Sequence, residues 1–251
     1  MSPTAAQEHS MTDRTVLITG ANKSIGYETA RQLGRQGFRI WLGSRDADRG
    51  EAAAENLAAE GINVRALTLD VTNDDSVRSA VARVEGDHGK LDILINNAGI
   101  SGLQPILPSE QPLDDIKTIY ETNVFAPIRV TQAFLPLLRA ATDASVIMIS
   151  SGLGSLGWLS DPSNPFYGVN ILGYNSSKTA LNAVTVAFAK ELAASGITVN
   201  AADPGYTATD FNGHTGYRTV EQAAAGIVWL ATRNAQDMTG RFYFEQNEVP
   251  W

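Results

Sequence analysis

The stretch T-V-L-I-T-G-A-N-K-S-I-G, residues 15–26, decides the fold of this chain. Its apolar start predicts a β-strand over 15–19, and the turn flanked by Gly20 and Gly26 leads into an expected helix over 25–36. Small residues at such a turn let the backbone approach a pyrophosphate, whose charge meets the helix N-terminus. The stretch therefore indicates a nucleotide-binding strand–turn–helix, although any tight junction of this kind can use glycine.

Outward from this stretch, apolar runs alternate with helix-like stretches along the chain. Further strands are expected at 38–43, 64–69, 91–95, 145–150, 197–201 and 241–244. Further helices are expected at 47–60, 74–87, 113–141, 173–195 and 220–232, with a kink or break in the third of these at Pro127 and Pro136. Strict alternation with near-continuous apolar strands predicts an α/β fold: one doubly wound parallel sheet of about seven strands with helices on both faces.

Composition narrows the function classes. The 251 residues suit one large domain over 13–251, preceded by a flexible tail at 1–12. The net charge of −8 argues against a nucleic-acid partner, and the absence of cysteine excludes disulfides and thiolate sites. Three scattered histidines predict no metal site. No apolar run approaches the ~18–20 residues of a membrane span, and no signal peptide is evident, so we expect a soluble cytoplasmic protein without membrane contact.

Tyr174 and Lys178, in Y-N-S-S-K, lie four residues apart on the expected 173–195 helix. This spacing places them on one helix face, one turn apart. Because a nearby cation favours the phenolate, we expect the pKa of Tyr174 to fall below its usual value of ~10. Such a tyrosine suits general acid/base chemistry on an alcohol oxygen, although the same pair also occurs by chance on surface helices.

The second expected strand ends in Gly43, Ser44 and Arg45. An NAD site usually has an acid about 20 residues after the glycine turn, and Ser44 is not acidic. Arg45 and Lys23 could instead straddle a 2′-phosphate, which favours NADP over NAD. NAD remains an alternative cofactor because of Asp46: a register shift of two residues would bring its carboxylate within reach of the ribose hydroxyls.

After the third expected strand, Asp70 could accept a hydrogen bond from adenine or cap the following helix. Asn73 is the better candidate for that cap.

Further motifs stand in a specific order: N-N-A-G at 96–99, T-N-V around Asn123, S-S at 150–151 and P-G-Y-T-A-T at 204–209. Together with the glycine turn and Y-N-S-S-K they resemble the short-chain dehydrogenase/reductase family from Thr19 to Phe244. N-K in the glycine turn and S-R after the second strand resemble its carbonyl-reductase branch. The resemblance implies a Rossmann-type fold and an oxidoreductase that transfers hydride from NADPH to a ketone or aldehyde, giving NADP+ and an alcohol, reversibly.

The resemblance also implies residue roles. Tyr174 matches the catalytic acid/base, Lys178 the residue that lowers the Tyr pKa and holds the nicotinamide ribose, and Ser151 the donor to the substrate oxygen. Asn123 matches the asparagine that steadies a water linked to the lysine. The S-x-x-G pattern with Gly154 favours Ser151 over Ser150. The implied cofactor contacts are Gly20, Asn22, Lys23, Ser24, Ile25, Gly26, Ser44, Arg45, Asp70, Val71, Asn97, Ala98, Gly99, Tyr174, Lys178, Pro204, Gly205, Thr207 and Thr209.

Two features depart from the family pattern. Ser24 stands where the family has a glycine, and the interval from Ser151 to Tyr174 is longer by roughly ten residues, the size of an ordinary functional loop. We expect substrate loops at about 155–172 and 205–218, the second a mobile lid in which His214 either contacts substrate or is simply exposed. The aromatic residues expected to line an apolar substrate pocket are Trp158, Phe166, Tyr206 and Phe211, although such aromatics are as often core.

Alternative functions remain at this stage. They are an NAD-dependent alcohol dehydrogenase, a reductase of C=C or C=N bonds, and a non-catalytic nucleotide-binding sensor. The four-residue Tyr–Lys interval argues against the second, and the intact catalytic set argues against the third. The two long helices that hold Asn123 and Tyr174 suggest a homodimer or homotetramer, and the longer loop leaves a monomer open. The sequence does not indicate the substrate or the favoured direction.

Overall fold

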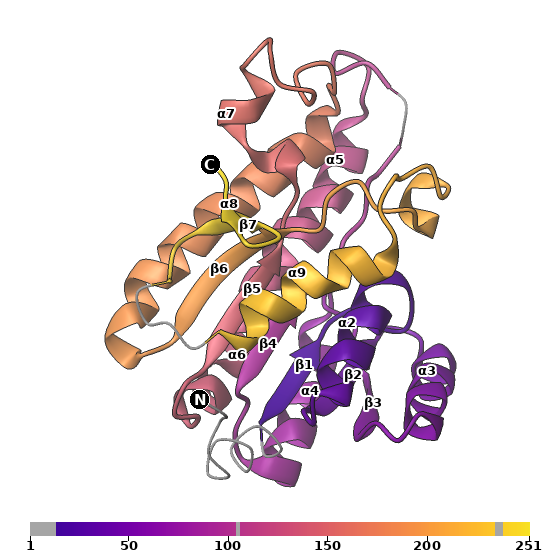
Figure 1. The fold of residues 1–251 in the computed structure, drawn as a ribbon, viewed down its shortest axis with the longest axis vertical. Helices are drawn as coiled ribbons and strands as arrows, with labels where there is room; N and C mark the ends of the chain where they lie inside the picture. Colours follow the sequence, from indigo (N-terminus) through magenta and orange to yellow (C-terminus); the bar gives the residue numbers. More distant parts are fainter. Residues whose placement is uncertain (1–13, 104–105, 234–237) are drawn as a thin grey trace, which may run out of the picture.

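One sheet organises the computed structural model, which describes residues 14–103, 106–233 and 238–251. Its eight strands run in the order β3-β2-β1-β4-β5-β6-β7-β8 (Figure 1). Their bounds are β1 Thr15–Ile18, β2 Arg39–Ser44, β3 Val64–Thr68, β4 Ile93–Asn96, β5 Ser145–Ile149, β6 Thr198–Asp203, β7 Phe242–Phe244 and β8 Asn247–Glu248. The seven expected strands are confirmed as parallel, and β8 adds a short antiparallel edge. The expected tail at 1–12 lies outside the described residues.

Helices cover both faces of the sheet, as expected (Figure 1). On one face lie α2 Ser24–Arg35, α3 Ala47–Ala59 and α9 Val220–Thr232. On the other lie α4 Asp74–His88, α6 Ala126–Arg139 and α8 Leu172–Leu192. Beyond these, α5 Leu113–Tyr120 packs on α8. The strand order reverses between β1 and β4, which is the point where ligands of doubly wound sheets bind, beyond the carboxyl ends of the strands.

Alternation within β1 explains why both faces are covered. Leu17 packs into the core below α4, α6 and α8, whereas Val16 and Ile18 pack into the core below α2, α3 and α9. All three side chains have no exposed surface. Each such burial contributes roughly 1.5–3 kcal/mol, so a strand that is apolar on both sides is held between two helical layers.

The expected break in the 113–141 helix is confirmed, and it takes the form of a π-helical turn, η1 (Glu121–Phe125), between α5 and α6. Pro127 lies in the first turn of α6 and has no N–H to donate to the carbonyl of Asn123, four residues earlier. The helical hydrogen bonds change from a four-residue to a five-residue spacing here, since the Ala126 N–H donates to the carbonyl of Glu121, five residues earlier. Pro136 is accommodated inside α6 without ending it.

The two expected substrate loops lie at one end of the molecule (Figure 1). The first contains a short helix, α7 (Leu156–Leu159), followed by turns up to α8. The second contains one 3₁₀ turn, η4 (Asp210–Asn212), and leads into α9. Both therefore stand beside the carboxyl ends of the parallel strands, where the candidate site is built.

Candidate active site

The turn between β1 and α2 packs tightly against the end of β4. Gly20 has a φ of +61°, which favours glycine, and a Cβ on Gly26 would lie 2.5 Å from the Asn97 side-chain nitrogen. The Asn97 amide donates to the carbonyls of Thr19 and Gly20 at 2.8 and 3.1 Å. The glycines thus allow the backbone of N-N-A-G to close one side of the turn.

Helix α2 begins without a side-chain cap at its N-cap residue, Lys23, whereas Asp46, Asn73 and Thr219 cap α3, α4 and α9. The first-turn N–H groups of any helix lack partners within the helix and carry a partial positive charge. An uncapped start at the switch point of the sheet therefore fits the pyrophosphate of a dinucleotide, which would bind these amides.

Ser24 adopts a φ of 54°, in the left-handed region that favours glycine. This is the position where the related family carries glycine. The serine therefore holds a backbone conformation that favours glycine, at the expense of strain.

At the end of β2, Ser44 is buried and its hydroxyl donates to the Asp46 carbonyl at 2.7 Å. The Asp46 carboxylate caps α3 by accepting from the Arg49 N–H at 3.0 Å. Asp46 was the acid that could have bound the ribose of NAD, and its carboxylate is instead engaged in its own helix. Arg45 is exposed, with no partner within the described part of the chain. Lys23 instead forms an ion pair with Asp210 at 2.7 Å, which joins the glycine turn to the 205–218 segment.

The remaining expected cofactor residues after β3 and β4 are Asp70, Val71, Asn97, Ala98 and Gly99. One Asp70 oxygen accepts from both the N–H and the hydroxyl of Thr72, at 3.0 and 2.7 Å. Asn73 caps α4 through the Ser76 N–H, which confirms it as the better cap.

Three expected catalytic side chains converge beyond β5. Tyr174 and Lys178 lie on α8, with the lysine Nζ 5.7 Å from the centre of the tyrosine ring, and the Ser151 side chain is near enough to the tyrosine to lower its pKa. The neighbouring Ser150 is 2 % exposed and its hydroxyl donates to Asn182 at 2.6 Å, so this serine links the end of β5 to α8. These contacts favour Ser151 over Ser150 as the serine that faces a substrate.

Gly154 lets the Ser151 turn pack closely on α8. A Cβ on Gly154 would lie 2.8 Å from the carbonyl carbon of Lys178. The glycine of the S-x-x-G pattern is therefore a close-approach residue that brings Ser151 and the helix together.

The expectation that the pKa of Tyr174 is lowered is wrong for this structure. Burial raises the pKa of Tyr174 above its ordinary value, and the charge of Asp203 raises it further, while the Ser151 side chain lowers it. The Lys178 Nζ donates to the carbonyl of Ile149 at 2.7 Å and does not hydrogen-bond the Tyr174 hydroxyl. Burial lowers the pKa of Lys178 to about 8, and Asp203 opposes that shift.

Asn123, in the π-helical turn, holds the chain that follows β4. Its side-chain oxygen accepts from the Ile100 N–H and its nitrogen donates to the Ile100 carbonyl, both at 2.9 Å. The same nitrogen donates to the Ser177 hydroxyl of α8 at 3.1 Å. The side chain therefore links β4, η1 and the helix that carries Tyr174.

The 204–209 stretch returns over the sheet end after β6. Gly205 has a φ of +71°, and a Cβ there would lie 2.6 Å from the Arg218 side chain. Thr207 and Thr209 are buried: the first donates to the carbonyls of Pro204 and Gly205, and the second caps η4. The segment is thus fixed by its own hydrogen bonds.

The four expected substrate aromatics divide into different contacts. Trp158 and Phe166 pack on each other at 5.5 Å between centroids and lie against Gly152, next to Ser151. Phe211 packs on Tyr174 at 5.6 Å. Tyr206 packs on Tyr217 and hydrogen-bonds Thr215, and it is 45 % exposed. Three of the four therefore lie beside Tyr174 or the Ser151 turn, and Tyr206 is engaged within its own loop.

His214 lies on the exposed side of that loop, where its ring pairs with Asp210 at 2.9 Å. The histidine thus shares the carboxylate that also holds Lys23.

Asp203 is a site residue that the sequence reasoning missed. It ends β6, is 7 % exposed, and influences the pKa values of both Tyr174 and Lys178. The signal that could have found it is a carboxylate directly before Pro204, at the end of an otherwise apolar strand.

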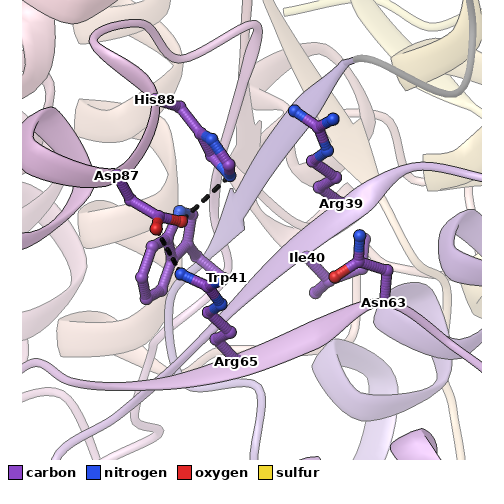
Figure 2. Close-up of a pocket in the computed structure, with 7 residues that line it drawn as sticks. All are labelled: Arg39, Ile40, Trp41, Asn63, Arg65, Asp87 and His88. Carbon is purple, nitrogen blue, oxygen red and sulfur yellow. Dashed lines mark hydrogen bonds and ion pairs between the residues drawn. The ribbon is translucent and has the colours of Figure 1, made fainter.

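A cavity of about 260 Å³ lies at the opposite, amino-terminal end of β2 and β3. Figure 2 shows Arg65 and His88 both directed to Asp87, the latter at 3.0 Å. Since its charged groups are paired and it is remote from the switch point, this cavity is separate from the candidate site.

Within 14–103, 106–233 and 238–251, no three His, Asp or Glu side chains gather as metal ligands. In the same ranges no helix combines the length and apolar character needed to cross a membrane.

A serine, a tyrosine and a lysine gathered beyond the carboxyl ends of a sheet that begins with a dinucleotide-type turn fit a nicotinamide-dependent oxidoreductase. The sequence model of the short chain dehydrogenase family matches residues 14–218, and the chain belongs to this family. It is 34 % identical over 247 residues to the short-chain dehydrogenase anuI of Penicillium roqueforti, covering 95 % of this chain and 97 % of that one. It is 32 % identical to (+)-neomenthol dehydrogenase of Arabidopsis thaliana, covering 95 % and 98 %.

Among solved structures, the chain is similar to an NADPH-bound carbonyl reductase from chicken fatty liver. The TM-score is 0.84 at 29 % identity, covering 95 % of this chain and 99 % of that one. Salutaridine reductase from Papaver somniferum is similar with a TM-score of 0.80 at 25 % identity, covering 92 % and 99 %.

Proposed function

We propose that this chain reduces ketone or aldehyde carbonyls with NADPH, with Tyr174 as the general acid. The observation that carries the proposal is the convergence of Ser151, Tyr174 and Lys178 on one site, with the lysine Nζ 5.7 Å from the centre of the tyrosine ring. The reaction is reversible, so alcohol oxidation at the same site is its other direction.

The preference for the phosphorylated cofactor rests on the end of β2. Ser44 leaves this position without an acid, the Asp46 carboxylate caps its own helix, and Arg45 is exposed and unpaired among the described residues. An arginine there can bind a 2′-phosphate with two parallel hydrogen bonds. The similar carbonyl reductase structure is described as NADPH-bound, which supports the same choice.

When bound, the nicotinamide supplies the hydride. Ser151 and Tyr174 would direct hydroxyl donors at the substrate oxygen as its negative charge develops, and Tyr174 would transfer its proton to that oxygen. A raised pKa keeps Tyr174 protonated at neutral pH, which is the form that carbonyl reduction requires. Lys178, with a pKa of about 8, remains mainly charged there and would hold the nicotinamide ribose.

The substrate side is apolar. Trp158 and Phe166 stand next to the Ser151 turn, and Phe211 covers the tyrosine ring. One relative is named for neomenthol, and we therefore favour a compact apolar ketone over a charged substrate.

The test is NADPH and NADH consumption with aldehydes, aromatic ketones and alicyclic ketones, in the wild type and in Tyr174→Phe. We expect turnover with NADPH that Tyr174→Phe reduces at least ~10²-fold, within the range of general acid contributions, while NADPH affinity stays similar. Tyr120→Phe is the matched control, because Tyr120 ends α5 and contacts Phe125 rather than this site. Equal activity in Tyr174→Phe contradicts the proposal, and so does tight NADPH binding without turnover across the panel.

A further inference from the structure

Asp203 is a buried carboxylate in the middle of the candidate site. It is the last residue of β6, paired in register with Phe244 of β7, and only 7 % of it is exposed. A buried carboxylate is costly unless hydrogen bonds and opposite charges compensate it. Its partners therefore indicate what it does.

Two backbone turns stabilise the ionised carboxylate. One oxygen accepts from the Gly205 N–H at 2.8 Å, two residues on, and the Gly152 N–H stabilises the charge as well. Gly152 leaves room for this approach, because a Cβ there would lie 2.9 Å from the second oxygen of Asp203. Gly152 directly follows Ser151, and Gly205 belongs to the 204–209 stretch, so one carboxylate holds two separate parts of the site.

The charges that face Asp203 come from two elements. Arg218, before α9, and Lys178, on α8, both stabilise the carboxylate. Arg218 is already paired with Glu245 at 2.7 Å. Within the described ranges, Lys178 has no carboxylate within ion-pair distance. Its Nζ donates to the carbonyl of Ile149 on β5. Ile149 is paired in register with Ala202 of β6, the residue before Asp203, so the ammonium lies near this carboxylate. Asp203 is therefore the acidic residue whose charge acts on the buried ammonium.

We propose that Asp203 is a positioning residue of the site: its carboxylate fixes the turns that carry Ser151 and Gly205, and it supplies the counter-charge of Lys178. The inference deepens the proposed carbonyl reduction and rests on it for its effect on turnover. The effect of its charge on Lys178 can be tested without turnover.

The sign of the expected change follows from the charge. A negative neighbour makes Lys178 and Tyr174 hold their protons more strongly, and the pKa effects of Asp203 on both groups have this direction. Burial raises the pKa of Asp203 itself, so its charge acts on Lys178 and Tyr174 only where the carboxylate is ionised. The titrations of these two groups are therefore compared at alkaline pH. Removing the charge should shift both titrations to lower pH.

The primary experiment is Asp203→Asn with lysine side chains labelled with ¹³C, the Lys178 signal being assigned by its loss in Lys178→Met. We expect Lys178 to titrate below the wild-type midpoint, with a roughly tenfold weaker proton affinity. The alkaline limb of kcat/KM for carbonyl reduction should move in the same direction. A purely structural role would lower stability or rate and leave both midpoints in place.

Asp92→Asn is the matched control. Asp92 is also buried, at 4 % exposed, and accepts a strand N–H, from Thr15 at 2.7 Å, but it precedes β4 at the opposite end of the sheet. Its substitution should leave the Lys178 titration unchanged. If Asp203→Asn does not fold by circular dichroism, Asp203→Ser serves, since a smaller hydroxyl can still accept from the Gly205 N–H without charge.

The outcomes separate the two proposals. An unchanged Lys178 midpoint in the folded Asp203 variant overturns the inference, and so does an equal shift in Asp92→Asn. A wild type that binds NADPH but turns over no carbonyl overturns the proposed function, while the Lys178 titration still decides the role of Asp203.

Discussion

The ring of Phe211 meets the ring of Tyr174 edge-on, with 5.6 Å between their centroids and 61° between their planes. Phe211 belongs to the 205–218 segment and Tyr174 to α8, so a loop far along the chain covers the proposed acid. Because burial is the largest cause of the raised pKa of Tyr174, this loop contributes to the chemistry as well as to the shape of the site.

Phe211→Ala should expose Tyr174 to water and so lower its pKa toward the ordinary value. The decline near pH 8 that depends on Lys178 should stay in place, because the pKa of Tyr174 lies above it. KM for apolar ketones should rise by roughly three- to tenfold, since Phe211 is 45 % exposed and loses only part of the burial energy of an aromatic ring. The measurement is kcat and KM against pH. Tyr217→Ala is the control, because Tyr217 packs on Tyr206 and is 75 % exposed; equal effects in both variants would contradict a specific role for Phe211.

Arg45→Gln should weaken NADPH binding and leave NADH binding nearly unchanged. Hydrogen bonds to charged groups contribute about 1.5–3 kcal/mol, so we expect roughly 10- to 100-fold weaker NADPH affinity. Fluorescence titration with both cofactors measures this. Arg49→Gln, an exposed arginine paired with Asp46 on the first turn of α3, should alter neither affinity. A parallel loss for NADH would show that Arg45 does not read the 2′-phosphate.

Asp210→Asn should release Lys23 from its ion pair across the glycine turn. Because both side chains are more than half exposed, the pair is weak, and NADPH affinity should improve only a few-fold, most clearly at low salt. His214→Asn removes the other partner of Asp210 and should not improve binding. If Asp210→Asn weakens NADPH binding instead, the ion pair supports the cofactor site and does not compete with it.

Carbonyl reduction should decline as pH rises through about 8, because Lys178 loses its charge there. The group is charged below this pKa, so the activity that depends on it is present at neutral pH and lost on the alkaline side. The measurement is kcat/KM for NADPH against pH, which reports the free enzyme. Lys178→Met should be slow throughout and lack this limb. A limb that persists in Lys178→Met belongs to another group.

The elements of this fold could be predicted because their causes are local in sequence. Alternation within β1, the cap at Asn73 and the missing N–H of Pro127 each act within a few residues of the structure they determine. The electrostatics of the site could not be predicted in this way. The direction of the Tyr174 pKa depends on burial and on Asp203, and the engagement of Lys23 depends on Asp210, 187 residues away. Helical spacing placed Tyr174 and Lys178 on one face, but it could not show that the ammonium is directed to Ile149.

Ser24→Gly should stabilise the protein slightly, because Ser24 has a φ of 54°. The left-handed conformation costs a non-glycine residue roughly 1–2 kcal/mol, and glycine adds about 0.4–1 kcal/mol of unfolded-state entropy. The difference predicts a free energy of unfolding that is equal or up to about 1.6 kcal/mol higher, measured by urea denaturation. Ser79→Gly, an exposed position inside α4, should have the opposite sign and lower stability by about 0.5 kcal/mol. Equal destabilisation by both substitutions would mean that the hydroxyl of Ser24 compensates the strain of the turn.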